Sequence, residues 1–455
     1  MSRPAPLLSG ALFLLVLLAL SMVWWGPIAR DFAAAGTGYG AKQLCSGVFV
    51  SGRDPRTVLE EDLGDLPAVI SAHANPDTGT VTASLGPLSR TAHYREGLGC
   101  TLAAGGTALE PMPVNANRAG TGTEAFPEAP DDAPRRLALG PLMEAAFSEP
   151  ARDAQRGTRA LVVVHRGQIV AERYAPGFDR DMPLPGWSMA KSVTNALTGV
   201  LVRDGQLGLD AAVPQWRDAN DGRESIRVRH LLQMTSGLAF DEDYADPLGD
   251  PIRMLFNEPD AAAFVRSKAL EAEPGSEWDY TSGTTNLLMA LLRDAVGDDR
   301  AWADFPREAL FRPLGMDSAV LEPDASGNFV GSSFMLATAR DWARFGQLYL
   351  HDGVWNGERL LPEDWVAFTR EPAPDADKGG YGAHFWLNRG DPDTGERPWP
   401  ELPADTYAAS GYQGQEVVIV PSADLVVVRL GLSRPREAWD REWFVGGVLD
   451  VLGED

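Results

Sequence analysis

The chain has 455 residues, of which 44% are hydrophobic, enough to build a large buried core. Its formal net charge is −24, and such an acidic surface repels nucleic-acid phosphates and anionic lipid, so neither is expected as a partner. The sequence has no phosphate-binding loop, no dinucleotide-binding glycine motif after a strand and no H-E-x-x-H pair, and its six histidines are scattered. We therefore predict neither a metal nor a cofactor.

The first 30 residues are predicted to lie outside the soluble fold. Residues 7–25 form an uncharged, mostly apolar run that is long enough for a membrane span and ends in Trp24-Trp25, which suits the membrane interface. The small-residue run Ala33-Ala34-Ala35 offers an alternative, a cleaved signal peptide. We predict a membrane anchor with the remaining chain exported to the periplasm or outside. The alternative is a secreted or periplasmic chain.

Residues 31–105 are predicted to form a small N-terminal segment that contains β-structure. The alternation of Thr80–Leu85 is typical of a half-buried strand. The two cysteines, Cys45 and Cys100, would pair in an oxidising compartment and staple this segment, and two separate buried thiols are the alternative. Residues 106–135 are rich in Gly, Pro, Ala and acidic side chains, which is typical of a linker.

Residues 136–455 are predicted to form one α+β domain. The stretch 161–174 indicates a hairpin that turns at Arg166-Gly167, and a second strand pair is expected at 416–421 and 424–430. Helical patterns dominate the sequence between these two strand regions. We therefore expect one antiparallel sheet, completed by distant segments and flanked by helices, beside a helical subdomain.

Ser188-Met189-Ala190-Lys191 carries the strongest chemical signal, at the start of an apolar helix expected to run to Val202. Residues at i and i+3 share a helix face, so the Lys191 amine can reach the Ser188 hydroxyl. A buried lysine can lose its proton and act as a base, which would make Ser188 an activated nucleophile. The alternative is a serine that caps the helix and a lysine that points into solvent.

Two later stretches complete a possible site. Tyr280-Thr281-Ser282 lies in a turn-rich segment before an apolar helix, so its tyrosine and serine can point into one cleft. Ala409-Ser410-Gly411 precedes the C-terminal strand pair, and a glycine beside a strand permits close backbone approach. Four aromatic residues are expected either to line a cleft or to pack in the core: Trp355, Trp365, Tyr381 and Trp386.

The order of these three motifs resembles the serine β-lactamase and penicillin-binding-protein superfamily. It is most similar to the class C branch, which includes β-lactamases, D-amino-acid peptidases, esterases and 6-aminohexanoate-dimer hydrolases. The resemblance implies a β-lactamase-like fold with Ser188 as nucleophile and Lys191 and Tyr280 as acid–base groups. It also implies that Ser282 supports Lys191 and that the backbone N–H groups of Ser188 and Tyr412 form the oxyanion hole.

The chain departs from this family pattern at the third motif. Many relatives carry a Lys or His where this chain has Ala409, and that cation helps to hold a substrate carboxylate. Arg340 or Arg344 could supply the missing charge from elsewhere in the fold. We therefore expect a small-molecule ester or linear amide as substrate. Hydrolysis or binding of β-lactams and D-amino-acid peptides is one alternative, and a non-catalytic, membrane-tethered binding module of the same fold is another.

A different hypothesis, the α/β-hydrolase fold, starts from Gly186-Trp187-Ser188-Met189-Ala190, which is one residue short of the nucleophile elbow of that fold. That hypothesis needs a downstream histidine, for which His351 and His384 come late enough in the chain, and it leaves Lys191 without a role. His230, in a Leu-rich helix, is expected to be structural.

Overall fold

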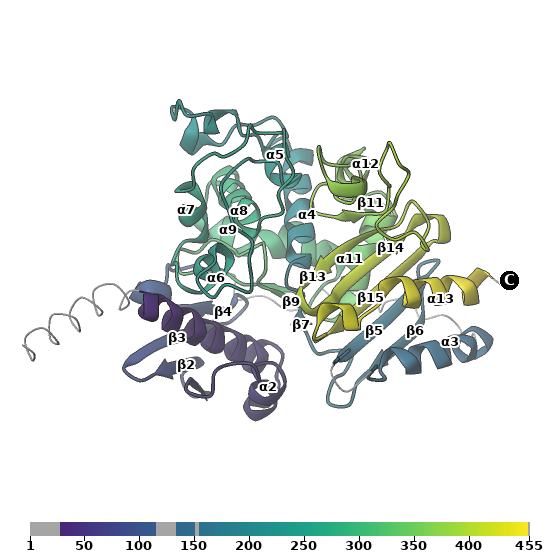
Figure 1. Ribbon diagram of the computed structural model, residues 1–455, viewed down its shortest axis with the longest axis horizontal. Coiled ribbons are helices and arrows are strands. Elements are labelled where there is room, and N and C mark those ends of the chain that lie inside the picture. Colours follow the sequence, from purple (N-terminus) through teal and green to yellow (C-terminus); the bar gives the residue numbers. More distant parts are fainter. Residues whose placement is uncertain (1–27, 115–132, 151–153, 454–455) are drawn as a thin grey trace, which may run out of the picture.

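The computed structural model describes residues 28–114, 133–150 and 154–453. Three parts are visible in Figure 1: an N-terminal unit, a helical subdomain and a six-stranded sheet covered by helices. Within the described ranges, no helix is both long enough and apolar enough to cross a membrane. The predicted anchor at 7–25 lies outside the described residues, as does most of the predicted linker.

The six-stranded sheet is antiparallel throughout and joins segments from both ends of the main domain, as predicted. The buried strand that contains residues 161–164 places alternate side chains in two cores: Val162 and Val164 face one side of the sheet, and Leu161 and Val163 face the other. In spatial order the strands are β12 (Trp386–Leu387), β13 (Tyr407–Gly411), β14 (Gln415–Val420), β15 (Leu425–Gly431), β5 (Thr158–His165) and β6 (Gln168–Tyr174).

Helices cover both faces of this sheet. α11 (Ala339–Leu350) packs on one face, where it contacts β5, β14 and β15. α3 (Ala133–Ala146) and α13 (Arg441–Gly453) lie along the other face (Figure 1) and close a second apolar core. The β5–β6 hairpin turns at Arg166 and Gly167, which both have positive φ, as the sequence predicts.

The helical subdomain fills most of the chain between β6 and β12. α4 (Met189–Arg203) stands between this subdomain and the sheet, since it contacts α8 as well as β13 and β14 (Figure 1). The other helices are α5 (Val228–Leu232), α6 (Asp250–Phe256), α7 (Ala261–Arg266), α8 (Ser282–Val296), α9 (Asp299–Pro306), α10 (Arg312–Leu314) and α12 (Trp365–Thr369).

Two small sheets in this region were not predicted, because strands of two or three residues are too short to show a periodic pattern. One sheet has the order β7-β9-β8, and the other is a two-stranded hairpin. Their strands are β7 (Leu184–Pro185), β8 (Val320–Leu321), β9 (Met335–Ala337), β10 (Val354–Trp355) and β11 (Glu358–Arg359). β7 leads directly into the turn before α4.

The N-terminal unit packs a helix over residues 28–45 on a four-stranded antiparallel meander. This helix, which continues as a π-helical turn at Ser46–Val50, was not predicted, and α2 (Pro55–Glu61) follows it. The predicted disulfide between Cys45 and Cys100 is present and joins the helix to the last strand. The strands are β1 (Ser71–Asn75), β2 (Thr80–Leu85), β3 (Leu88–Arg95) and β4 (Gly99–Leu102).

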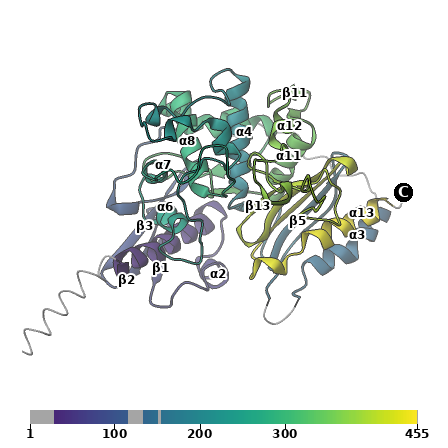
Figure 2. The same ribbon diagram turned by 45° about the horizontal axis from the view of Figure 1, so that its top comes forward.

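A buried carboxylate fastens this unit to the main domain. Glu322, which follows β8, forms an ion pair with Lys42, and both side chains are 1% exposed. The same carboxylate accepts hydrogen bonds from the Ser46 hydroxyl, at 3.0 Å, and from the Cys100 backbone N–H, at 2.6 Å. All of these donors belong to the N-terminal unit. This unit lies beside α6 (Figure 2), where its Tyr39 ring meets the ring of Phe256 in α6.

Replacing Lys42 with Met should lower the free energy of unfolding by about 3–5 kcal/mol, because it leaves Glu322 buried without its counter-charge. The double variant Lys42→Met with Glu322→Leu should recover much of this loss. Lys378→Met removes a largely exposed ion pair with Glu396 and should change stability by less than about 1 kcal/mol. Denaturant unfolding measures all three. A Lys42→Met effect no larger than that of Lys378→Met would contradict the prediction.

Candidate active site

Ser188 lies at the first turn of α4, half-buried, and directly after Trp187, whose φ of 49° places it in the left-handed region. Such a conformation is unfavourable for a bulky residue and is found most often where a site needs it. The Ser188 side chain makes no capping hydrogen bond to α4. Instead its Oγ lies 3.2 Å from Lys191 Nζ, so the helix-cap interpretation is wrong.

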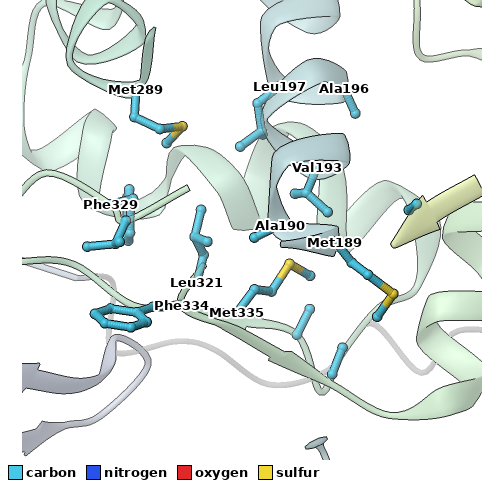
Figure 3. Close-up of a cluster of buried hydrophobic side chains, with 14 of the residues drawn as sticks. Met189, Ala190, Val193, Ala196, Leu197, Met289, Leu321, Phe329, Phe334 and Met335 are labelled. Carbon is cyan, nitrogen blue, oxygen red and sulfur yellow. The ribbon is translucent and has the colours of Figure 1, made fainter. Parts of the chain in front are cut away.

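An apolar cluster holds this first turn in place (Figure 3). Met189, Ala190 and Val193 of α4 are 0% exposed. Their neighbours in the cluster come from α8, β8, β9 and the loop between β8 and β9: Met289, Leu321, Phe329, Phe334 and Met335. Because close packing on these side chains leaves the turn little freedom, the positions of Ser188 and Lys191 are fixed relative to each other.

Lys191 is 1% exposed, and its ammonium has three hydrogen-bond acceptors. They are Ser188 Oγ at 3.2 Å, Ser282 Oγ at 2.9 Å and the Ser332 carbonyl oxygen at 3.1 Å. The Lys191 amine therefore lies between the two serine hydroxyls, within hydrogen-bond distance of both. Ser282 is thus in hydrogen-bond contact with Lys191, and its supporting role stays a prediction, whereas Ser332, in the loop between β8 and β9, was not foreseen.

Tyr280 reaches the site through its ring. Lys191 Nζ lies 4.8 Å from the centroid of this ring, a cation–π contact. The ring stacks on Trp386, at 5.4 Å between centroids, and meets Tyr381 edge-on at 5.8 Å. Among the described residues, no hydrogen bond joins the Tyr280 hydroxyl to Ser188 or Lys191. Its acid–base role stays a prediction.

The four aromatic residues considered in the sequence divide into two kinds. Tyr381 and Trp386 belong to the cleft wall around Tyr280. Trp365 is buried core whose indole N–H donates to Asn195 Oδ1, and Trp355 packs against the same core.

Glu242 and Tyr244 extend the site, although neither residue lies in a recognisable sequence motif. Ser282 donates to Glu242 twice, from its hydroxyl at 2.5 Å and from its backbone N–H at 2.8 Å. The Tyr244 hydroxyl also donates to Glu242 and lies 3.1 Å from Ser282 Oγ. Burial of this hydroxyl and the Glu242 charge raise the pKa of Tyr244 well above its usual value. A continuous hydrogen-bonded chain therefore runs from Ser188 through Lys191 and Ser282 to Glu242.

We expect Glu242→Gln to lower kcat about ten- to a hundredfold, because a hydrogen bond to a charged group contributes roughly 1.5–3 kcal/mol. KM should change little, since Glu242 acts through Ser282. Asp243→Asn removes a charge from the same loop without this contact and serves as the control. Ester hydrolysis kinetics give both readouts. Equal kcat values for the two variants would rule out the positioning role.

The third motif lies along β13, with its side chains on opposite faces. Ala409 packs in the core on the α11 side, whereas the Ser410 hydroxyl accepts a hydrogen bond of 2.6 Å from Arg441 of α13. Arg441 also forms a buried ion pair with Glu416, so its charge is compensated. The two arginines proposed as substitute cations are engaged elsewhere: Arg340 pairs with Glu172 at 2.6 Å, and Arg344 pairs with Asp341 at 2.8 Å.

Gly411 brings the end of β13 against the turn that carries Ser188. A Cβ at this position would lie 2.2 Å from the Gly186 carbonyl oxygen and 3.2 Å from the Ser188 backbone nitrogen, so only glycine fits. Tyr412 follows, half exposed, with its ring edge-on to Trp187. β12 pairs only with Tyr407 and Ala408, so within the described chain no strand covers the outer edge of β13 beside the site.

Buried Arg429 holds the turn after Gly411. Its guanidinium donates to the Gln413 and Gly414 carbonyl oxygens, at 2.9 and 2.8 Å, and burial lowers the pKa of Arg429 to about 9. These bonds fix the backbone of the turn that carries the Tyr412 N–H.

The histidines do not form a triad with Ser188. His384 is buried and lies 2.9 Å from the Lys191 carbonyl oxygen and 3.2 Å from Thr285 Oγ1. Burial and the nearby Lys191 charge lower the pKa of His384 to about 3, so its ring is neutral. His351 ends α11. The six-stranded sheet is also antiparallel, so the α/β-hydrolase hypothesis is wrong.

His230 is structural, since its ring nitrogen accepts a hydrogen bond from the Arg227 backbone N–H at the start of α5.

This combination of an antiparallel sheet, a helical subdomain and a serine–lysine pair at a helix start defines a class of serine hydrolases. The sequence model of the Beta-lactamase family matches residues 143–442, about two thirds of the chain. The protein belongs to this family and is a serine hydrolase. The N-terminal unit lies outside the matched residues.

Individual relatives support the same placement. The chain is 24% identical to the 6-aminohexanoate-dimer hydrolase of Paenarthrobacter ureafaciens over 297 residues, which cover 60% of this chain and 72% of that protein. It is 27% identical to penicillin-binding protein 4 of Amycolatopsis lactamdurans over 304 residues, which cover 59% and 75%. A solved structure from Bacillus anthracis, provisionally named as a 6-aminohexanoate-dimer hydrolase, superposes with a TM-score of 0.56 at 22% identity and covers 76% of this chain and 90% of its own. This last likeness establishes the shared fold.

Proposed function

We propose that the protein hydrolyses ester or linear amide bonds through an acyl-enzyme on Ser188. The observation that carries this proposal is the buried Lys191 amine, which lies within hydrogen-bond distance of both the Ser188 and the Ser282 hydroxyls. A neutral Lys191 would accept the Ser188 proton while Oγ attacks the substrate carbonyl. Tyr280 and Lys191 would then pass that proton to the oxygen or nitrogen of the leaving group as its bond to the carbonyl carbon breaks.

The negative charge on the carbonyl oxygen would be held by the backbone N–H groups of Ser188 and Tyr412. The short approach between Gly411 and the Ser188 nitrogen supports this assignment. Water would then attack the acyl-enzyme, with the same groups taking its proton and returning one to Ser188 Oγ.

The third motif favours substrates without a carboxylate at this position. Ala409 brings no charge, and the charge of Arg441 is met by Glu416. One relative is named a 6-aminohexanoate-dimer hydrolase, and the bond that joins such a dimer is a linear amide. Hydrolysis or binding of β-lactams remains the second candidate, because another relative is named a penicillin-binding protein.

The deciding experiment compares kcat/KM for p-nitrophenyl butyrate and for nitrocefin on one preparation of the full chain. We expect the ester value to exceed the nitrocefin value at least about tenfold, since a lost charge-assisted hydrogen bond is worth roughly that factor. The opposite order would favour the β-lactam alternative. A fluorophosphonate probe that fails to label Ser188, together with no hydrolysis of either compound, would favour a non-catalytic binding module.

We also propose that the chain is exported and held by a membrane segment within residues 1–30. The Cys45–Cys100 disulfide supports an oxidising compartment, where such bonds persist. Cell fractionation tests this directly: recovery in the cytosolic fraction with both thiols reduced would refute it.

A further inference from the structure

A cavity of about 320 Å³ opens beside the proposed site, and no step of the proposed mechanism uses it. Its lining includes Arg441, the oppositely charged residues Asp377 and Arg436, Ala376 and four aromatic residues: Trp278, Tyr381, Trp386 and Trp399. We call it the aromatic cavity. An apolar cavity of roughly 150 Å³ is enough to hold benzene, so this one has room for an aromatic ring and a short linker.

The aromatic cavity shares a wall with the catalytic groups. Trp386 lines the cavity and also stacks on Tyr280, whose ring faces the Lys191 amine. Tyr381 and Trp278 pack against Trp386 with centroid distances of 5.1 and 6.3 Å. A group bound in the cavity therefore contacts Trp386, whose ring stacks directly on Tyr280, the residue proposed to protonate the leaving group.

The other end of the aromatic cavity reaches the third motif. Arg441 lies 4.0 Å from the Trp399 ring and donates to Ser410 Oγ on β13. Because Glu416 compensates its charge, Arg441 contributes a flat, stacked guanidinium to the cavity wall instead of a free cation. Flat aromatic faces with little net charge select planar apolar groups, which gain both buried area and ring–ring contacts.

We propose that the aromatic cavity binds a planar aromatic group on the leaving-group side of the substrate. This inference rests on the proposed function and narrows it to esters or amides of aromatic alcohols or amines. The aromatic ring of such a group would lie against Trp386 and Trp399, and the linker to the scissile bond would run along the edge of the Tyr280–Trp386 stack toward Ser188.

The test compares kcat/KM for benzyl butyrate and methyl butyrate, followed by acid release at constant pH, on the full chain. The wild type should prefer the benzyl ester at least about tenfold, since one added methylene in a fitting pocket already contributes about that much. Ala376→Trp fills the aromatic cavity and should bring the ratio close to one, while methyl butyrate hydrolysis stays within about threefold of wild type.

Two further variants complete the test. Ala301→Trp adds the same side chain at an exposed helix position and should leave the benzyl preference intact. Trp399→Ala should lower the benzyl preference without changing a ring that contacts Tyr280. The result therefore does not depend on the folding of a single variant. A wild-type ratio at or below one, or a ratio that Ala376→Trp leaves unchanged, would overturn this inference while the hydrolase proposal stands. No hydrolysis of either ester by the wild type would instead remove the proposed function.

Discussion

Replacing Ser188 with Ala should lower kcat/KM at least about 10³-fold, because removal of an activated nucleophile leaves only binding and oxyanion stabilisation. The free energy of unfolding should change by less than about 1 kcal/mol, since the Ser188 hydroxyl is half-buried and caps nothing in α4. Ester hydrolysis and denaturant unfolding on the same preparation measure the two effects.

Ser192→Ala is the matched control one turn along the same helix. Its buried hydroxyl donates to the His384 carbonyl oxygen at 2.7 Å, so this variant should lose about 1 kcal/mol of stability and keep activity within a few fold. The two variants thus exchange their effects: one loses activity and keeps stability, and the other does the reverse. Near-normal hydrolysis by Ser188→Ala would end the nucleophile assignment.

Gly411→Val should lower kcat at least about 10²-fold, the effect expected when one oxyanion-hole donor is displaced. Its Cβ would lie 2.2 Å from the Gly186 carbonyl oxygen, so either β13 or the turn before Ser188 must move. Tyr412 directly follows β13 and Ser188 directly follows that turn, and their backbone N–H groups are the two assigned to the oxyanion hole. Steady-state kinetics on a short ester measures the loss, which should fall mainly on kcat.

Gly411→Ala carries the same Cβ without the branch and tests the assignment if the valine variant folds poorly. Gly208→Val, where an added Cβ meets nothing within 4 Å, is the control and should keep full activity. Full activity in both Gly411 variants would show that the oxyanion hole lies elsewhere. Both Gly411 variants should also unfold at a lower temperature than the wild type, because their Cβ meets the Gly186 backbone, so activity is compared well below that temperature.

Local sequence patterns were sufficient for the elements that frame the site. The β5–β6 hairpin, the strand pair β14–β15 and helix α4 each carry a clear period or turn signal, and they were predicted within a few residues. The short strands β7, β8 and β9 were missed because they exist only as partners of one another. The helix over 28–50 was missed because Gly and small residues dominate its sequence.

The Ser188–Lys191 pair is the part of the candidate site that the sequence determined by itself, because a spacing of three residues on a helix fixes the neighbourhood of two side chains without any help from the rest of the fold. Tertiary structure alone decided which groups surround that pair. Ser282, at the start of α8, and Ser332, in the loop between β8 and β9, contact Lys191. Glu242 contacts Ser282 and lies in an acidic stretch that resembles an ordinary solvated loop. Likewise the charge beside Ser410 comes from Arg441 on the last helix, not from the arginines considered in the sequence. Contacts between distant segments depend on how sheets and helices pack, and a single sequence carries no local signal for them.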